Sequence, residues 1–228
     1  MKLKISKIVK DFLIIHLIFV ALCVLILLIP ISGSIGIKLF ILVAIYNIII
    51  PLFAYLRNHT EWINMWLFVF ILSLFQVWPD WFLSAELGIL VFPEDGFIKI
   101  GTVSLYMAGL WAIPLFLIIF IGSYLQERYS MQRVYLIVGF LSLIIFGLAE
   151  QTIWMLESWY AQNVIMVGHL ALYIIIPEII LGITTFYGYN LIQDKNNLLK
   201  IPVAFTIMLL YLGSAVFFYF LIERVIIL

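Results

Sequence analysis

The stretch FLIIHLIFVALCVLILLIPI, from Phe12 to Ile31, decides the fold class of this chain. It is apolar on every face of a helix and contains no Asp, Glu, Lys or Arg. A helix of about 20 such residues crosses a hydrocarbon core of about 30 Å, whereas a membrane β-barrel uses strands of about 10 residues with alternating polarity. The stretch therefore predicts a transmembrane helix.

The composition of the whole chain extends this prediction. Of its 228 residues, 66% are hydrophobic and only 11% are charged, against about 25% charged residues in soluble domains. We therefore predict a single all-α integral membrane domain, a bundle of about seven transmembrane helices. The predicted helices span residues 12–31, 37–56, 62–78, 103–125, 133–150, 164–189 and 201–222, and residues 79–102 form an interfacial or re-entrant segment.

Basic residues predict the orientation of the bundle, because short cytoplasmic loops are enriched in Lys and Arg. With a cytoplasmic N-terminus, most basic residues fall inside, while Lys38, Lys99 and Arg224 fall outside. The inside set is Lys2, Lys4, Lys7, Lys10, Arg57, Arg128, Arg133, Lys195 and Lys200. We expect a protein of the bacterial inner membrane, with its C-terminus on the outer side.

Acidic residues gather on the predicted outer side of the membrane. In VFPEDGFIKIG, Val91 to Gly101, Pro93 and Gly96 interrupt the chain around Glu94 and Asp95. Asp80 precedes this passage, and Glu150 and Glu157 follow in EQTIWMLESWY, where with Trp154 they share one face if the helix continues. Two interpretations remain open: solvated loop acids, or parts of an outer site that binds a cation or pairs with Lys99.

Tryptophans are expected at the same level as these acids. An interfacial belt of aromatic residues anchors many membrane helices. This interpretation applies to Trp78, Trp81, Trp111, Trp154 and Trp159.

Glu178 is the one acid that falls well inside a predicted span, directly after Pro177. An ionisable group in a membrane helix is a functional candidate by default. If the helix starts at Val164, Glu178 lies roughly 21 Å along it, so a site shared with Glu94 requires re-entry of the outer loop. One alternative is a structural role, in which protonated Glu178 donates a hydrogen bond to the backbone freed by Pro177 or to Asn47, Asn64 or Tyr211 on other helices. The other is a proton or cation path that includes His169.

Several kinds of chemistry find no support in the sequence. The three histidines are far apart and Cys23 is alone, so we predict no metal site, no haem and no disulfide. The last predicted span contains no lysine for a retinal Schiff base. No nucleotide-binding motif or basic nucleic-acid patch is present, and we predict no cofactor and no nucleic-acid partner.

Three resemblances follow from the middle of the chain. The run WPDWFLSAELGILVFPEDGFIKIGTVSLYMAGLWAIPLF resembles an uncharacterised family of small bacterial multi-pass membrane proteins. Asp80 followed by FPEDGF is similar to the proline and paired-acid motif of integral-membrane lycopene cyclases, whose second motif would fall on Pro177 and Glu178 without its paired acid. The stretch IGTVSLYMAGLW is similar to a motif of membrane carotenoid hydratases, with Ser104 in place of a proline.

The first resemblance implies no activity. The similarities to cyclases and hydratases imply acid catalysis on an isoprenoid or carotenoid drawn from the membrane, by cyclisation or hydration of an alkene. The implied catalytic acids are Asp80, Glu94, Asp95 and Glu178. The substrate-binding residues that we predict beside these acids are Tyr106, Trp111, Glu150, Trp154, Glu157 and His169. The competing hypothesis is a non-enzymatic transporter, an ion or proton pathway, or a structural membrane subunit, and the oligomeric state stays open.

Overall fold

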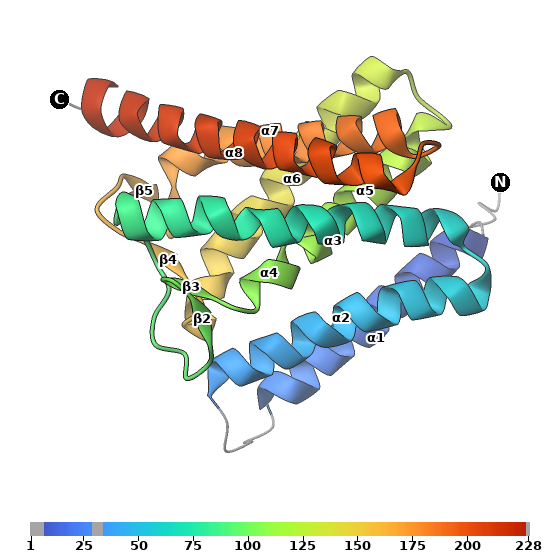
Figure 1. Cartoon of the computed structure of the whole chain (residues 1–228), viewed down its shortest axis with the longest axis horizontal. Helices are drawn as coiled ribbons and strands as arrows, with labels where there is room; N and C mark the ends of the chain where they lie inside the picture. Colours follow the sequence, from blue (N-terminus) through green and yellow to red (C-terminus); the bar gives the residue numbers. More distant parts are fainter. Residues whose placement is uncertain (1–6, 29–33, 227–228) are drawn as a thin grey trace.

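The protein is described here by a computed structural model covering residues 7–28 and 34–226. Lys2, Lys4 and residues 29–31 of the first predicted helix lie outside the described residues. Within them, seven helices are long and apolar enough to cross a membrane, which confirms the predicted fold class. The helices lie side by side in an elongated bundle (Figure 1).

The helices that build this bundle follow the apolar runs of the sequence. The long ones are α1 (Lys7–Leu28), α2 (Ile35–Arg57), α3 (Thr60–Trp81), α5 (Ala112–Gln126), α6 (Met131–Thr152), α7 (Leu172–Ile192) and α8 (Lys200–Phe220). The short ones are η1 (Phe82–Glu86), α4 (Met107–Leu110), η2 (Ile153–Leu156), η3 (Asn197–Leu199) and η4 (Leu221–Ile226). Most short helices extend a long one, since η1 continues α3 and η2 continues α6.

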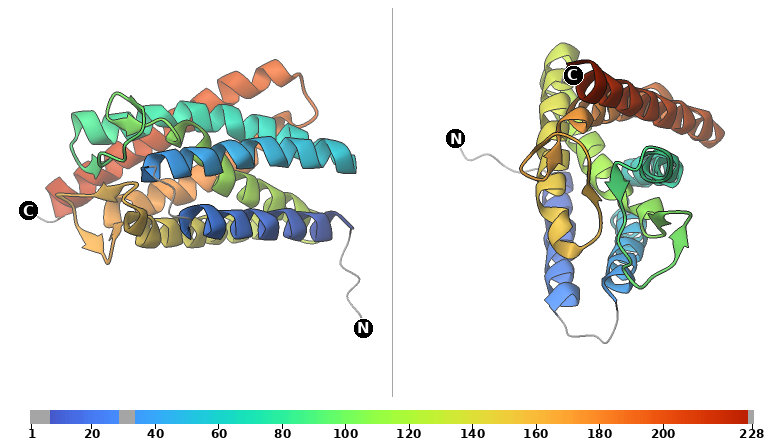
Figure 2. Two further views of the ribbon diagram at one scale, coloured as in Figure 1. Left: turned by 90° about the horizontal axis from the view of Figure 1, so that it is seen from below. Right: turned by 90° about the vertical axis from the view of Figure 1, so that its left-hand side faces the viewer.

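Short strands close one end of the bundle, which we call the capped end. They are β1 (Leu90–Val91), β2 (Lys99–Ile100), β3 (Val103–Ser104), β4 (Tyr160–Ala161), β5 (Met166–Val167) and β6 (Leu170–Ala171). Three antiparallel pairs form, β1 with β4, β2 with β3, and β5 with β6. The β1–β4 pair joins the α3–α4 connection to the α6–α7 connection, so two distant parts of the sequence form one cap (Figure 2).

The opposite end, which we call the basic end, carries Arg57, Arg128, Arg133 and Lys195 in or beside its turns. There Arg57 donates hydrogen bonds to both carboxylate oxygens of Asp11, at 2.8 and 3.0 Å. His59 contacts the same carboxylate at 2.9 Å. These contacts join the start of α1 to the turn between α2 and α3.

The chain between α3 and α4, predicted as an interfacial or re-entrant segment at residues 79–102, is helical only at its start. Helix α3 runs through Pro79 to Trp81 and continues as η1, and the rest forms strands and turns. Gly101 permits the tight β2–β3 turn, since its φ is +62° and an added Cβ would lie 2.8 Å from Trp81 Cδ1. The segment is a cap over the helix ends.

The start of α7 also differs from the prediction. Residues 164–171, expected to be helical, contain the β5–β6 hairpin, and Gly168 has a φ of +66°. Helix α7 begins at Leu172, so Glu178 lies six residues into it, about 9 Å along the axis. The predicted depth of roughly 21 Å is therefore wrong, and Glu178 lies near the capped end.

Helix α3 occupies the middle of the bundle. It packs against α2, α5 and α8, while α7 packs against α6 and α8. Seen along the bundle, α3 lies between the α7–α8 pair and the α1–α2 pair (Figure 2). The inner faces of α3, α6 and α7 meet in the buried core near the capped end, where the candidate site lies.

Candidate functional site

Three carboxyl groups from three helices line one small cavity at the capped end. Asp80 comes from the last turn of α3, Glu150 from the last turn of α6, and Glu178 from the second turn of α7. The cavity has a volume of about 30 Å³, and we call it the acidic cavity. Asp80 and Glu178 are 2% and 3% exposed, so these groups are enclosed by protein.

Indole groups orient two of the three carboxyl groups. Trp111 Nε1 donates a hydrogen bond to Asp80 Oδ2 at 3.0 Å, and Trp159 Nε1 donates one to Glu150 Oε1 at 2.9 Å. The carboxyl group of Glu178 makes no hydrogen bond to another described residue. Two acids are thus held in fixed orientations, and the third is free to bond to a ligand or water.

These contacts revise the prediction that all five tryptophans form an interfacial belt. Trp78 and Trp154 are 58% and 39% exposed, as belt residues are. The indoles of Trp111 and Trp159 instead point into the protein toward the acids. A buried indole N–H needs an acceptor, and the carboxyl groups provide one.

The rest of the acidic cavity is aromatic and apolar. The rings of Trp111 and Tyr211 have centroids 5.7 Å apart, and Tyr173 completes the aromatic wall. The other lining residues are Leu83, Leu90, Phe92, Met107, Ala161, Ala171 and Ile174. Among the described residues, no Lys, Arg or His lines the cavity, so none of their cations neutralises the three acids.

A second, larger space adjoins the acidic cavity. It has a volume of about 230 Å³ and lies between the α4–α5 segment and α6, and we call it the apolar pocket. The two spaces share Met107, Trp111, Glu150, Trp159 and Glu178. The remaining walls are Leu110, Ile113, Pro114, Leu117, Ile145, Phe146, Ala149 and Ile153.

The apolar pocket reaches the side of the bundle. Its wall residues Ile113, Leu117 and Ile145 are half-buried, and Ile144 and Leu148 on α6 beside them are exposed. In a membrane such an apolar lateral surface contacts lipid tails. The apolar pocket thus lies next to the apolar lateral surface of α6.

The predicted catalytic residues separate into two groups. Asp80 and Glu178 line the acidic cavity, whereas Glu94 and Asp95 do not. Glu94 is exposed and accepts a hydrogen bond from Lys99 Nζ at 2.9 Å. Asp95 is buried and accepts hydrogen bonds from Ser104 Oγ and from the backbone N–H of Phe97, at 2.6 and 2.9 Å. Asp95 thus stabilises the loop fold.

The predicted substrate-binding residues separate in the same way. Trp111 and Glu150 line the acidic cavity. Tyr106 is buried elsewhere, where its hydroxyl lies 2.7 Å from Ser158 Oγ. The remaining three, Trp154, Glu157 and His169, line a separate outer pocket, in which the rings of Trp154 and His169 stack 4.0 Å apart.

The expected shared face of Glu150, Trp154 and Glu157 does not form. Helix α6 ends at Thr152, η2 follows, and Glu157 has a left-handed backbone with φ of +52°. Glu150 therefore points inward while Glu157 is exposed. Because Lys99 pairs with Glu94, neither acid has the partner considered for it.

Sequence reasoning missed part of the lining. Tyr173 and Trp159 were not proposed as site residues, and Tyr211 was proposed only as a hydrogen-bond partner of Glu178. Tyr173 precedes Glu178 by five residues within an apolar run, which carries no signal of its own. Among the described residues, no group of three or more His, Cys, Asp or Glu side chains is placed to hold a metal ion.

Comparison with known proteins places this site within a family. Residues 77–222 match DUF6989, a domain of unknown function. The matched range contains Asp80, Glu150 and Glu178 together with α4 to α8, but not α1 or α2. No curated protein and no solved structure matches the chain, and no similarity to carotenoid cyclases is found. This chain, with its candidate membrane-spanning helices, belongs to the DUF6989 family.

Proposed function

We propose that this protein is a membrane enzyme that protonates a carbon–carbon double bond of an isoprenoid-class molecule, leading to cyclisation or hydration. One observation carries the proposal: Glu150 and Glu178 lie where the apolar pocket meets the acidic cavity. An alkene is a weak base, so its protonation requires a carboxylic acid in a dry, apolar site. By the positive-inside rule, we further propose that the basic end faces the cytoplasm of a bacterial inner membrane.

The walls of the apolar pocket support an apolar substrate. Apart from Glu150, Glu178 and the indole groups, its lining consists of Leu, Ile, Met, Phe, Pro and Ala side chains. A volume of about 230 Å³ is below the usual range for whole ligands, roughly 300–1,000 Å³. We infer that the pocket holds one end of a longer chain whose remainder lies in the bilayer beside α5 and α6.

The three acids have different surroundings, which suggests different roles. Glu178 lines both spaces and its carboxyl group is not held by a described residue, so it is our proton donor. Glu150 also lines both spaces and is oriented by Trp159, so it is our proton acceptor. Asp80 lines only the acidic cavity and is oriented by Trp111, so we assign it the role of positioning a water molecule.

The reaction begins when the carboxylic O–H of Glu178 gives its proton to one alkene carbon. The π electrons form the new C–H bond, and the other alkene carbon becomes a carbocation. The faces of Trp111 and Tyr173 stabilise this positive charge. The carboxylate left on Glu178 adds a negative charge in the same cavity.

The carbocation can react in two ways, and each reaction conserves atoms and charge. In cyclisation, a second double bond of the same molecule attacks the cation, and the Glu150 carboxylate removes a proton from an adjacent carbon. In hydration, water adds to the cation and gives its extra proton to Glu150. A cavity of about 30 Å³ has room for about one water molecule. Exchange with solvent then deprotonates Glu150 and protonates Glu178, which completes the cycle.

The test uses purified protein, lycopene as an acyclic probe, and heavy water as solvent. Protonation by Glu178 places deuterium on carbon, so wild type should form a deuterated cyclic or hydrated product. Glu178→Gln should reduce its formation by about 10²-fold or more. Lipids that co-purify with each protein are compared by mass spectrometry.

Glu94→Gln is the matched control, because it makes the same chemical change at an exposed acid. It should leave product formation unchanged. Equal deuterium incorporation by wild type and Glu178→Gln would contradict the role of Glu178. Wild-type protein that binds no isoprenoid and forms no deuterated product would contradict the proposed activity.

A further inference from the structure

Unpaired polar groups lie in the core on the basic side of the acidic cavity. They are the hydroxyl of Ser73, both ends of the Gln76 amide and the hydroxyl of Thr185, and all three residues are 0% exposed. Leaving a buried polar group without a hydrogen-bond partner destabilises a protein. Such groups in a protein core are usually bound by internal water.

These residues lie on the same helix faces as the cavity acids Asp80 and Glu178. On α3, Gln76 and Ser73 precede Asp80 by four and seven residues, which places them on the same face about 6 and 10 Å closer to the basic end. On α7, Thr185 follows Glu178 by seven residues, again on the same face and about 10 Å closer to that end. Helices α3 and α7 run in opposite directions. The polar residues of both helices therefore form two rows that extend from the acidic cavity toward the basic end.

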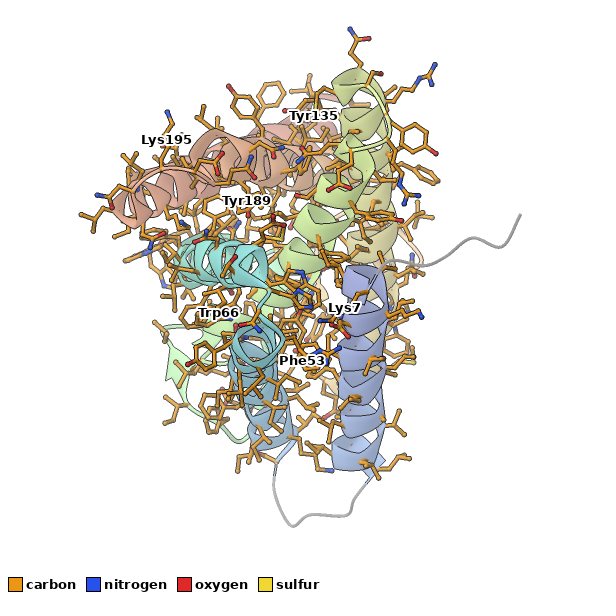
Figure 3. All side chains as sticks on the ribbon, turned by 90° about the vertical axis from the view of Figure 1, so that its right-hand side faces the viewer. Lys7, Phe53, Trp66, Tyr135, Tyr189 and Lys195 are labelled. Carbon is orange, nitrogen blue, oxygen red and sulfur yellow. The ribbon has the colours of Figure 1, made fainter. Side chains whose placement is uncertain are left out.

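The rows lead to the basic end through Tyr189, one turn beyond Thr185. Tyr189 is 2% exposed, and its ring centroid lies 6.2 Å from that of Phe68 on α3. Figure 3, seen from the basic end, places Tyr189 between α7 and α3. Glu61 and Asp194, both exposed at that end, are close enough to interact electrostatically with it.

Asn190 adds another unpaired group at this level, since both polar atoms of its amide are buried without a partner. Polar groups thus occur at successive depths, from Asp80 and Glu178 to the exposed acids Glu61 and Asp194. We name Ser73, Gln76 and Thr185 the polar column.

We propose that the polar column holds a chain of internal water molecules that conducts protons between the acidic cavity and the basic end. Hydroxyl and amide groups both donate and accept hydrogen bonds, so they support a continuous hydrogen-bonded chain of water. The column contains no charged side chain. Protons pass along such a chain without a carboxylate at each step, whereas a metal cation needs several oxygen ligands at each step.

The proton acceptor at the end of this column is the group of acids around Glu178. The titratable side chains that face Glu178 in the cavity are Asp80 on α3, Glu150 on α6, Tyr173 on α7 and Tyr211 on α8. The α4–α5 segment contributes Met107 and Trp111, which do not titrate. This proton route does not depend on which molecule occupies the apolar pocket. It determines only the side of the membrane from which the acids receive protons.

The test measures protonation of Glu178 in lipid vesicles with a different pH on each side. Dicyclohexylcarbodiimide, an apolar reagent that modifies protonated carboxyl groups, is added, and the modified Glu178 peptide is quantified by mass spectrometry. Protein orientation is determined by proteolysis at the exposed turn near Lys195. We expect the wild-type rate to follow the pH at the basic end, changing by up to about tenfold per pH unit.

Gln76→Leu and Thr185→Val should remove this dependence on the pH at the basic end. Thr184→Val is the matched control, because Thr184 is adjacent to Thr185 but donates its hydroxyl to the Ile180 carbonyl at 2.7 Å. This control should behave as wild type. A wild-type rate that follows the pH at the capped end, or variants that retain wild-type behaviour, would overturn the proposal.

Thermal unfolding of the same variants provides a second test that does not depend on the reagent. If the polar column contained no water, Gln76→Leu would remove a buried amide without a hydrogen-bond partner and raise the melting temperature. If water satisfies Gln76, the substitution should leave the melting temperature unchanged or lower it. A clear increase for both Gln76→Leu and Thr185→Val would therefore contradict the proposal, whatever the result of the lycopene assay.

Discussion

Two sets of acids at the capped end have opposite surroundings. Glu94 and Asp95 are adjacent in the sequence, and each accepts hydrogen bonds from nearby residues. Lys99 donates to Glu94, and the Ser104 hydroxyl and the Phe97 N–H donate to Asp95. Asp80, Glu150 and Glu178 are far apart in the sequence, yet they line one cavity to which residues 7–28 and 34–226 contribute no basic side chain. The paired acids that stand out in the sequence therefore build the cap, while the dispersed acids form the candidate site.

The largest expected effect separates these two sets by activity. Glu150→Gln should reduce deuterium incorporation into lycopene by about 10²- to 10⁴-fold, because it removes the proton acceptor. Glu157→Gln, at an exposed acid on the same connection, should leave the rate unchanged. The measurement is product formation per unit time by mass spectrometry, and equal losses in both variants would remove the distinction between cavity and surface acids.

A smaller effect separates the loop acids from each other by stability. Asp95→Ala leaves the Ser104 hydroxyl and the Phe97 N–H without their acceptor in a buried place, which should cost about 2 kcal/mol of unfolding free energy. Glu94→Ala removes only an exposed ion pair, so its melting temperature should match that of wild type. Thermal unfolding in detergent measures both, and a stable Asp95→Ala variant would show that the loop does not depend on this carboxylate.

The smallest expected effect concerns the apolar pocket. Ala149→Phe fills space beside Glu150 and should lower isoprenoid binding about tenfold, equivalent to about 1.4 kcal/mol. Ala108→Phe is the control, because Ala108 lines a different apolar groove, against α2 and α3. Bound isoprenoid per protein is measured by mass spectrometry. If Ala108→Phe lowers binding and Ala149→Phe does not, the ligand occupies the groove beside α2.

Helix boundaries were predicted less well than the helices themselves. The apolar runs that form α1, α2 and α8 are long and uninterrupted, so their existence follows from hydropathy alone. Residues 164–171 are also apolar, but they form a hairpin because β5 pairs with β6 and Gly168 allows the turn. Because of this hairpin, α7 begins at Leu172 and Glu178 lies near the capped end, not in the middle of a span as predicted. There it lines the same cavity as Asp80.

The role of each tryptophan illustrates a second limit. Hydropathy places Trp111 and Trp154 at the same membrane level, and in that respect the two are equivalent. In the structure, Trp111 faces Asp80 while Trp154 stacks on His169 at the surface. The position of a residue within an apolar segment predicts its depth in the membrane. The direction of its side chain depends on how each helix is rotated about its axis when it packs against the others.

The sequence by itself determined that this chain is an all-helical membrane bundle, because a lipid solvent leaves long apolar segments few alternatives to the helix. It also marked Asp80, Glu150 and Glu178 as candidates. The packing of the helices was needed to show that these three acids share a cavity and that Glu94 and Asp95 do not join them. It was also needed to show that Ser73, Gln76 and Thr185 are buried without partners. Contacts between residues about 100 positions apart depend on helix packing, which hydropathy does not encode.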